Sequence, residues 1–126
     1  YEQHWRAFPD AVPALTRALE AGLQVGILTN GATELQQRKL ERTGLDISGV
    51  QLLTSTDLGA AKPNPECYER ALAAIETTAH ETIMVGDSFP NDVEGARAVG
   101  ITAFHLVRGH SSDDLYSLPS LDLLPF

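Results

Sequence analysis

Two aspartates stand close together directly after an apolar run of four residues, Thr-Ile-Met-Val. The stretch that follows reads Gly-Asp-Ser-Phe-Pro-Asn-Asp and covers residues 86–92. A carboxylate such as Asp87 is a hard oxygen ligand of the kind that Mg²⁺ takes together with phosphate and water. Asp92 is expected near the start of the next helix, where it is suited to orient a neighbouring lysine or a metal-bound water. The stretch therefore predicts a site for a metal ion and an anion.

Two other segments carry groups that suit an anion. Thr29, Asn30 and Gly31 follow the apolar run at 24–29, and they offer a hydroxyl and backbone N–H groups to an oxyanion. Lys62, followed by Pro63, adds a full positive charge on a flexible stem, which suits a phosphate or a nearby carboxylate nucleophile. These groups predict that the pocket is locally positive in an otherwise acidic chain.

Each of these features also has a structural alternative. Thr29–Gly31 also fits a plain strand-to-helix turn, Lys62 a solvated loop lysine, and Asp87 or Asp92 a helix cap. Their order favours a shared site, because each follows a predicted strand. The carboxyl ends of the strands in an open parallel sheet form the edge at which ligands bind.

The elements that must position these residues alternate between short apolar runs and amphipathic helical patterns. This alternation predicts an α/β protein with a mainly parallel sheet. The expected strands cover residues 24–29, 50–55, 82–87 and 102–107, and helices are expected at 9–22, 33–43, from 64 onwards, and at 91–100.

Local signals predict where several helices begin and end. Asp10 is the expected N-cap of the first helix, and Thr33 with Gln36 resembles a capping box for the second. Gly44 is expected to end that second helix, and Asn64 followed by Pro65 is expected to open the third.

Composition limits the classes of protein to consider. The chain has 126 residues, of which 43% are hydrophobic and 21% charged, and this fits one soluble domain over residues 1–126. The formal net charge of −8 argues against nucleic acid or an anionic membrane as a partner. One cysteine, Cys67, excludes an internal disulfide, suits a reducing cytoplasm, and is expected to pack in the core.

The three segments together resemble a known family. "GILTNG", "KPNPECYERAL" and "VGDSFPNDVEGARAVG" are similar to motifs II, III and IV of the haloacid dehalogenase-like (HAD) hydrolases, in the branch with a helical cap. The resemblance implies a Rossmann-like three-layer α/β/α core. It also implies a role for each matching residue: Thr29 and Asn30 bind a phosphoryl group with help from the Gly31 amide, Lys62 neutralises charge, Asp87 ligates Mg²⁺, and Asp92 orients its neighbours.

The departure from the family pattern concerns its nucleophile. The family uses the first Asp of a D-x-D motif on a strand between those of motifs II and IV, and no two aspartates in this sequence are separated by two positions. We therefore expect 1–126 to be a partial core in which motif I, its central strand and the cap are absent. The chain alone is expected to be inactive. The gap is expected to be filled by an N-terminal segment, by a second chain, or by direct pairing of the two flanking strands.

The resemblance implies an activity as well. "GDS…D" is more similar to phosphatases than to true haloacid dehalogenases. The expected parent is a Mg²⁺-dependent phosphatase that acts on a small phosphorylated metabolite through an aspartyl-phosphate. A non-catalytic phosphate-binding or regulatory module, and a 2-haloacid dehalogenase, remain as alternatives.

Overall fold

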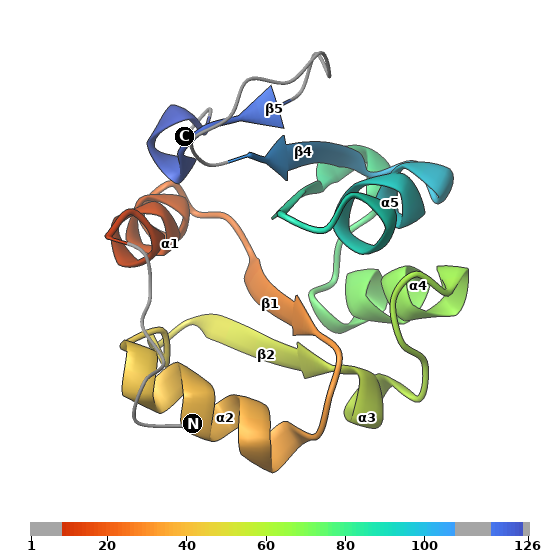
Figure 1. Cartoon of the computed structure of the whole chain (residues 1–126), viewed down its shortest axis with the longest axis horizontal. Helices are drawn as coiled ribbons and strands as arrows, with labels where there is room; N and C mark the ends of the chain where they lie inside the picture. The colour runs from red at the N-terminus through yellow and green to blue at the C-terminus, as the bar shows by residue number, and fades with distance from the viewer. Residues whose placement is uncertain (1–8, 108–116, 125–126) are drawn as a thin grey trace.

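The computed structural model describes residues 9–107 and 117–124 (Figure 1). Within these ranges the helices are α1 (Ala11–Glu20), α2 (Thr33–Thr43), α3 (Ser55–Leu58), α4 (Pro65–Ala74) and α5 (Gly95–Ala98). The strands are β1 (Val25–Thr29), β2 (Val50–Thr54), β3 (Ile83–Gly86), β4 (Thr102–Leu106) and β5 (Ser117–Leu118). Single turns of 3₁₀-helix cover Ala79–Glu81 and Leu121–Leu123, and a π-helical segment covers Phe89–Glu94. The expected α/β class and the four expected strands are confirmed.

The strands form two separate parallel sheets. β1 pairs with β2 from Val25 opposite Val50 to Thr29 opposite Thr54. β4 lies between β3 and β5 in the second sheet. Of the three expected ways to fill the gap, direct pairing of the strands at 24–29 and 82–87 is not found, because β1 and β3 belong to different sheets. Each of these two strands is paired along one edge only within the described part of the chain.

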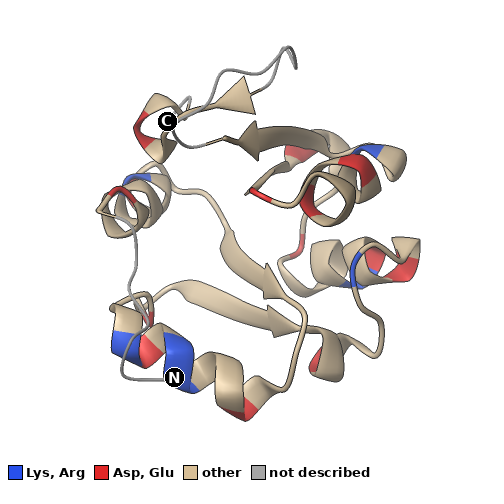
Figure 2. Cartoon of the chain, in the orientation of Figure 1, with Lys and Arg blue, Asp and Glu red and all other residues tan. Residues whose placement is uncertain are grey.

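Helices cover both sheets. Figure 1 shows α2 alongside the β1–β2 pair, while α4 and α5 lie next to each other beside the sheet of β3 and β4. The strands consist of apolar and uncharged residues, so Lys, Arg, Asp and Glu lie on the helices and loops (Figure 2). This distribution is what burial of a parallel sheet between helices requires.

The main core lies between α4, the π-helical segment, α5 and β4. It is built from one cluster of buried residues: Tyr68, Val93, Ala96, Ile101 and Ala103. Leu28 and Met84 pack against this cluster. The core therefore joins the carboxyl end of β1 to the second sheet even though no strand pairing does so.

Two of the expected helix caps are confirmed. α2 is followed by Gly44 in the left-handed conformation. The side chain of Asn64 accepts a hydrogen bond from the N–H of Glu66, and Pro65 is the first residue of α4. Both signals act within one turn of the chain, which explains why they can be recognised locally.

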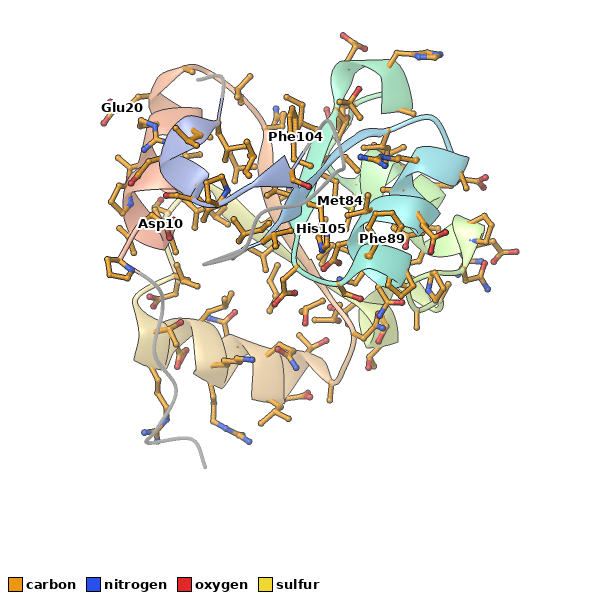
Figure 3. All side chains as sticks on the ribbon, turned by 45° about the horizontal axis from the view of Figure 1, so that its top comes forward. Asp10, Glu20, Met84, Phe89, Phe104 and His105 are labelled. Carbon is orange, nitrogen blue, oxygen red and sulfur yellow. The ribbon has the colours of Figure 1, made fainter. Side chains whose placement is uncertain are left out.

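Of the other two caps, one is confirmed in position only and one is wrong. Asp10 is the N-cap residue of α1, as expected, but its side chain makes no capping bond. Its carboxylate instead accepts hydrogen bonds of 2.9 Å from the Ser120 hydroxyl and the Leu121 N–H, at the turn near the chain's far end (Figure 3). The N-cap of α2 is Ala32, and the Thr33 hydroxyl shares a 2.8 Å hydrogen bond with the Thr54 hydroxyl. In both cases a partner distant in sequence replaces the local one.

None of the helices in the described ranges is long and apolar enough to cross a lipid bilayer.

Candidate active site

The loop after β1 is tied to the beginning of α3. The Gly31 N–H donates a 2.8 Å hydrogen bond to the Ser55 hydroxyl, and the Thr56 hydroxyl donates one of 2.8 Å to the Gly31 carbonyl. The Gly31 amide, expected to face a phosphate, therefore already has a protein partner. Thr29 is half-buried, and its hydroxyl makes only a long contact of 3.4 Å with the neighbouring Asn30 carbonyl. The Thr29 hydroxyl is therefore more available than the Gly31 amide to donate a hydrogen bond to a ligand.

Asn30 and Lys62 hold each other by two hydrogen bonds. The Lys62 N–H donates to Asn30 Oδ1 at 2.9 Å, and Asn30 Nδ2 donates to the Lys62 carbonyl at 3.2 Å. The peptide bond from Lys62 to Pro63 is cis. This pair of bonds fixes the backbone of Lys62 beside the end of β1, although the two residues are 32 positions apart.

The Lys62 ammonium joins β1 to the π-helical segment that follows β3. Nζ donates a hydrogen bond of 3.2 Å to the Leu28 carbonyl of β1 and lies 2.6 Å from Asp92 Oδ1. The side chains of Lys62 and Asp92 are only 11% and 10% exposed. An ion pair in such a position is screened by solvent much less than one at the surface.

The Asp92 carboxylate is held from a second side. Its Oδ2 accepts a 3.1 Å hydrogen bond from the Ser88 N–H. Gly86 ends β3 directly beneath this carboxylate, and a Cβ at residue 86 would lie 2.2 Å from Asp92 Oδ2. The glycine is therefore required for the close approach of Asp92 to the strand end.

Asp87 follows β3 and is exposed. Its carbonyl lies 3.1 Å from His105 Nε2, and the His105 ring meets Phe89 edge-on, as Figure 3 shows for these two side chains. Within the described residues no three His, Cys, Asp or Glu side chains gather closely enough to hold a metal ion. Asp87 therefore stands just after the end of β3, and no cluster of three possible metal ligands surrounds it within the described residues.

A cavity of about 630 Å³ separates the two sheets. Residues 25–28 of β1 and 83–85 of β3 line it, together with apolar residues of α1 and α4. Lys62 and Asp92 also line it, and they contact each other where β1 and β3 end. The structure thus brings Asn30, Lys62 and Asp92 together, with Thr29 next to Asn30 in the chain, and Lys62 and Asp92 line one mostly apolar space.

The chain matches the model of a known protein family. The model of the haloacid dehalogenase-like hydrolases matches residues 1–100. The chain belongs to this family.

Relatives of this HAD-like chain include phosphatases. It is 37% identical over 114 residues to the phosphoserine phosphatase of Thermus thermophilus, which covers 90% of the chain and 46% of that protein. The HAD phosphatase structure from Thermococcus onnurineus superimposes with a TM-score of 0.81 at 32% identity, over 92% of this chain and 55% of that one. A dehalogenase determined as an intermediate complex superimposes with a TM-score of 0.86 at 26% identity, over 96% and 56%. The HAD-like chain spans about half the length of the relatives it matches.

Sequence reasoning missed three residues that shape the HAD-like site. Ser55 and Thr56 anchor the Gly31 loop, and the run Thr-Ser-Thr that begins with the last residue of β2 was an available signal for them. Tyr68 is 1% exposed, and its hydroxyl donates to the Asn91 carbonyl next to Asp92. No local pattern distinguishes this tyrosine from an ordinary core residue.

Cys67 packs as expected. The residue is fully buried in α4. Burial raises the pKa of the Cys67 thiol, an effect that the positive charge of Lys62 partly offsets. A raised pKa keeps the group in its unreactive thiol form at neutral pH.

Tyr68 is expected to titrate late. Burial, with smaller contributions from Cys67 and Asp92, raises the pKa of Tyr68 to about 12. An unfolded tyrosine loses its proton near pH 10, so the folded state binds one proton more between the two values. The stability that this difference contributes is complete below pH 10 and is lost as the pH rises towards 12.

Tyrosinate absorbance measured against pH tests this expectation, with Tyr68→Phe identifying the late step. Circular dichroism on the same samples reports folding. If Tyr68 ionised near pH 10 while the chain was still folded, the assignment would fail.

Proposed function

We propose that this chain is the larger part of the core of a hydrolase that removes phosphate from a small phosphorylated metabolite. One observation carries the proposal: the Lys62 ammonium lies between the Leu28 carbonyl and the Asp92 carboxylate, beside the Thr29–Asn30 loop. A largely buried cation next to a hydroxyl and an amide is suited to a transferring phosphoryl group, whose charge spreads over its oxygens. The phosphatase relatives support the same class of substrate.

The residues take the following roles in this proposal. Thr29 and Asn30 bind phosphoryl oxygens, and Lys62 neutralises charge between the phosphoryl group and its attacker. Asp92 orients Lys62 by their 2.6 Å contact. We leave the Gly31 amide out of the contact set, because it donates to Ser55.

Asp87 is the residue that would hold Mg²⁺. Its exposed carboxylate follows the end of β3, and Mg²⁺ commonly takes one or two carboxylates and fills its remaining positions with phosphate and water. The fit is partial, since the described residues bring together no three side chains of the kinds that hold a metal ion. When bound, the ion would neutralise charge on the phosphoryl oxygens.

The nucleophile is proposed to come from outside the described residues. The space between β1 and β3 has mostly apolar walls and a cation at its mouth, so it suits an apolar parallel strand that ends in a carboxylate. Such a strand would pair with the edges of β1 and β3 that are unpaired within the described residues, and it would place its carboxylate against Lys62. An N-terminal segment of the same chain, or a second chain, is the proposed source.

The test compares two proteins: the 126-residue chain, and the same chain joined at its N-terminus to the proposed segment that carries the attacking carboxylate. Phosphate release from p-nitrophenyl phosphate and from phosphoserine is measured with and without Mg²⁺. We expect release from the joined protein only, and only with Mg²⁺, because the chain alone lacks the attacking carboxylate. A third sample, in which the preceding segment is added as a separate peptide, asks whether a second chain can complete the sheet.

Other outcomes would replace the proposal. Halide released from a 2-haloacid without any phosphate release would assign a dehalogenase, to which the structural similarity to a dehalogenase also points. Binding of inorganic phosphate by the joined protein, with no turnover of either substrate, would assign a phosphate-binding module.

A further inference from the structure

Tyr68 connects α4 to the segment that carries Asp92. Its side chain is the largest among the fully buried ones, and it belongs to the core cluster with Val93 and Ala96. The Tyr68 hydroxyl donates a hydrogen bond to the carbonyl of Asn91, the residue that precedes Asp92. A buried phenol aimed at one backbone carbonyl is more specific than hydrophobic packing requires, because phenylalanine would fill nearly the same volume.

The segment that this bond reaches is irregular. Residues Phe89–Glu94 form a π-helical turn, a conformation rare in proteins and frequent at functional sites. Its beginning is held at Ser88, whose carbonyl accepts the Asp92 N–H at 2.7 Å and whose hydroxyl accepts the Asn91 N–H at 3.4 Å. The Tyr68 hydroxyl adds an anchor from a different helix, directly at the peptide group that leads into Asp92.

Gly95 makes room for this anchor. A Cβ at residue 95 would lie 2.1 Å from the Tyr68 hydroxyl oxygen and 2.8 Å from Cζ. Any side chain at this position would therefore push the phenol away from the Asn91 carbonyl. The glycine and the tyrosine hydroxyl form a matched pair.

We propose that Tyr68 is a positioning residue: its hydroxyl holds the 89–94 turn so that Asp92 meets the Lys62 ammonium, and Gly95 provides the space for it. The proposal rests on the proposed function in that Lys62 is the group being positioned. The contact chain runs from the Tyr68 hydroxyl to the Asn91 carbonyl, through the next peptide group to Asp92, and from Oδ1 to Nζ. Because the phenol keeps its proton far above neutral pH, it stays a donor throughout the working range of the chain.

The test measures how accessible the Lys62 amine is. Lys39 and Lys62 are the chain's two lysines, and Lys39 is exposed on α2, so it serves as an internal reference. Trace acetylation followed by mass spectrometry gives the ratio of Lys62 to Lys39 labelling. In the wild type we expect a low ratio, because Lys62 is largely buried and paired with Asp92.

Tyr68→Phe should raise this ratio about fivefold, the factor that corresponds to one lost hydrogen bond. Gly95→Ala should also raise the ratio, because its new methyl group displaces the phenol. In the double variant, the logarithm of the labelling ratio should rise by less than the sum of the two single-variant rises. The reason is that Tyr68→Phe removes the oxygen atom that the new methyl group would meet most closely. Leu72→Ala is the control, because Leu72 packs on the same core from the same helix and lies outside the contact chain.

The results decide between positioning and ordinary packing. If Tyr68→Phe lowered the melting temperature as Leu72→Ala does but left the labelling ratio unchanged, Tyr68 would be a core residue only and the proposal would be overturned. If Tyr68→Phe failed to fold, Gly95→Ala alone would decide, because the proposal requires a raised ratio there too. Labelling needs no substrate, so a failure of the hydrolase assignment would appear separately, in the phosphate assay.

Discussion

Lys62→Ala will slow phosphate release by the completed protein about 10³-fold. Loss of one group that stabilises developing charge costs a factor of about 10² to 10³, and a missing cation in phosphoryl transfer costs about 10³ to 10⁵. Lys62 also links Leu28 of β1 to Asp92, so its loss removes the charge and the bridge between the sheets together. Initial rates with p-nitrophenyl phosphate at saturating Mg²⁺ measure the effect.

Lys39→Ala is the matched control for this change. It removes the chain's other lysine, which is exposed on α2, and should leave the rate within about twofold, because a surface substitution away from the site usually changes little. A Lys62→Ala protein that folds and keeps its full rate would remove Lys62 from the mechanism. A loss of rate in both variants would indicate a general effect of charge.

Asp92→Ala will lower the free energy of unfolding of this chain by about 3–5 kcal/mol. Removing one partner of a buried ion pair leaves the other charge without compensation, and that penalty exceeds the net value of the pair. In the variant, the Lys62 ammonium would keep only its hydrogen bond to the Leu28 carbonyl, and the Ser88 N–H would lose the carboxylate that accepts from it. Urea denaturation followed by circular dichroism gives the difference from the change in midpoint at constant slope.

Glu66→Ala supplies the comparison. Glu66 pairs with Arg70 at 2.9 Å, but these side chains are 61% and 49% exposed, so the loss should stay below about 1 kcal/mol. The loss of unfolding free energy in Asp92→Asn should fall between those of Asp92→Ala and Glu66→Ala. The amide oxygen of the new side chain still accepts the Ser88 N–H but carries no charge. If Asp92→Ala and Glu66→Ala lowered the free energy of unfolding equally, burial would not make the Lys62–Asp92 pair more important for stability than an exposed pair.

Much of the local structure could be predicted from sequence. The apolar runs that became β1 to β4 are short and bounded by turn residues, so their type and order follow from composition within a few positions. The Gly44 and Asn64 signals succeeded because each concerns backbone groups only a few residues away. The order of strand ends also predicted one shared edge for Thr29, Lys62, Asp87 and Asp92. Of these, Lys62 and Asp92 are in direct contact in the structure.

The side-chain contacts that the sequence did not predict have a common cause. Asp10 and Thr33 both have the side chains of cap residues, but Ser120 with Leu121 and Thr54 offered them better partners after folding. Ser55 was missed for the same reason, because its partner Gly31 lies 24 positions away. A side chain that can bond either locally or distantly cannot be assigned from its neighbours in sequence.

The sequence by itself determined the α/β class, the order of the strands along the chain and the identity of the residues at the strand ends. Periodicity and short-range backbone chemistry encode these features. Only the tertiary structure decided that β1 and β3 stand apart, with Lys62 bridging Leu28 and Asp92 at the mouth of the space between them. It also decided that a buried phenol from α4 meets the carbonyl beside Asp92. Both depend on how separate elements pack in three dimensions, and spacing along a chain carries no direct record of that.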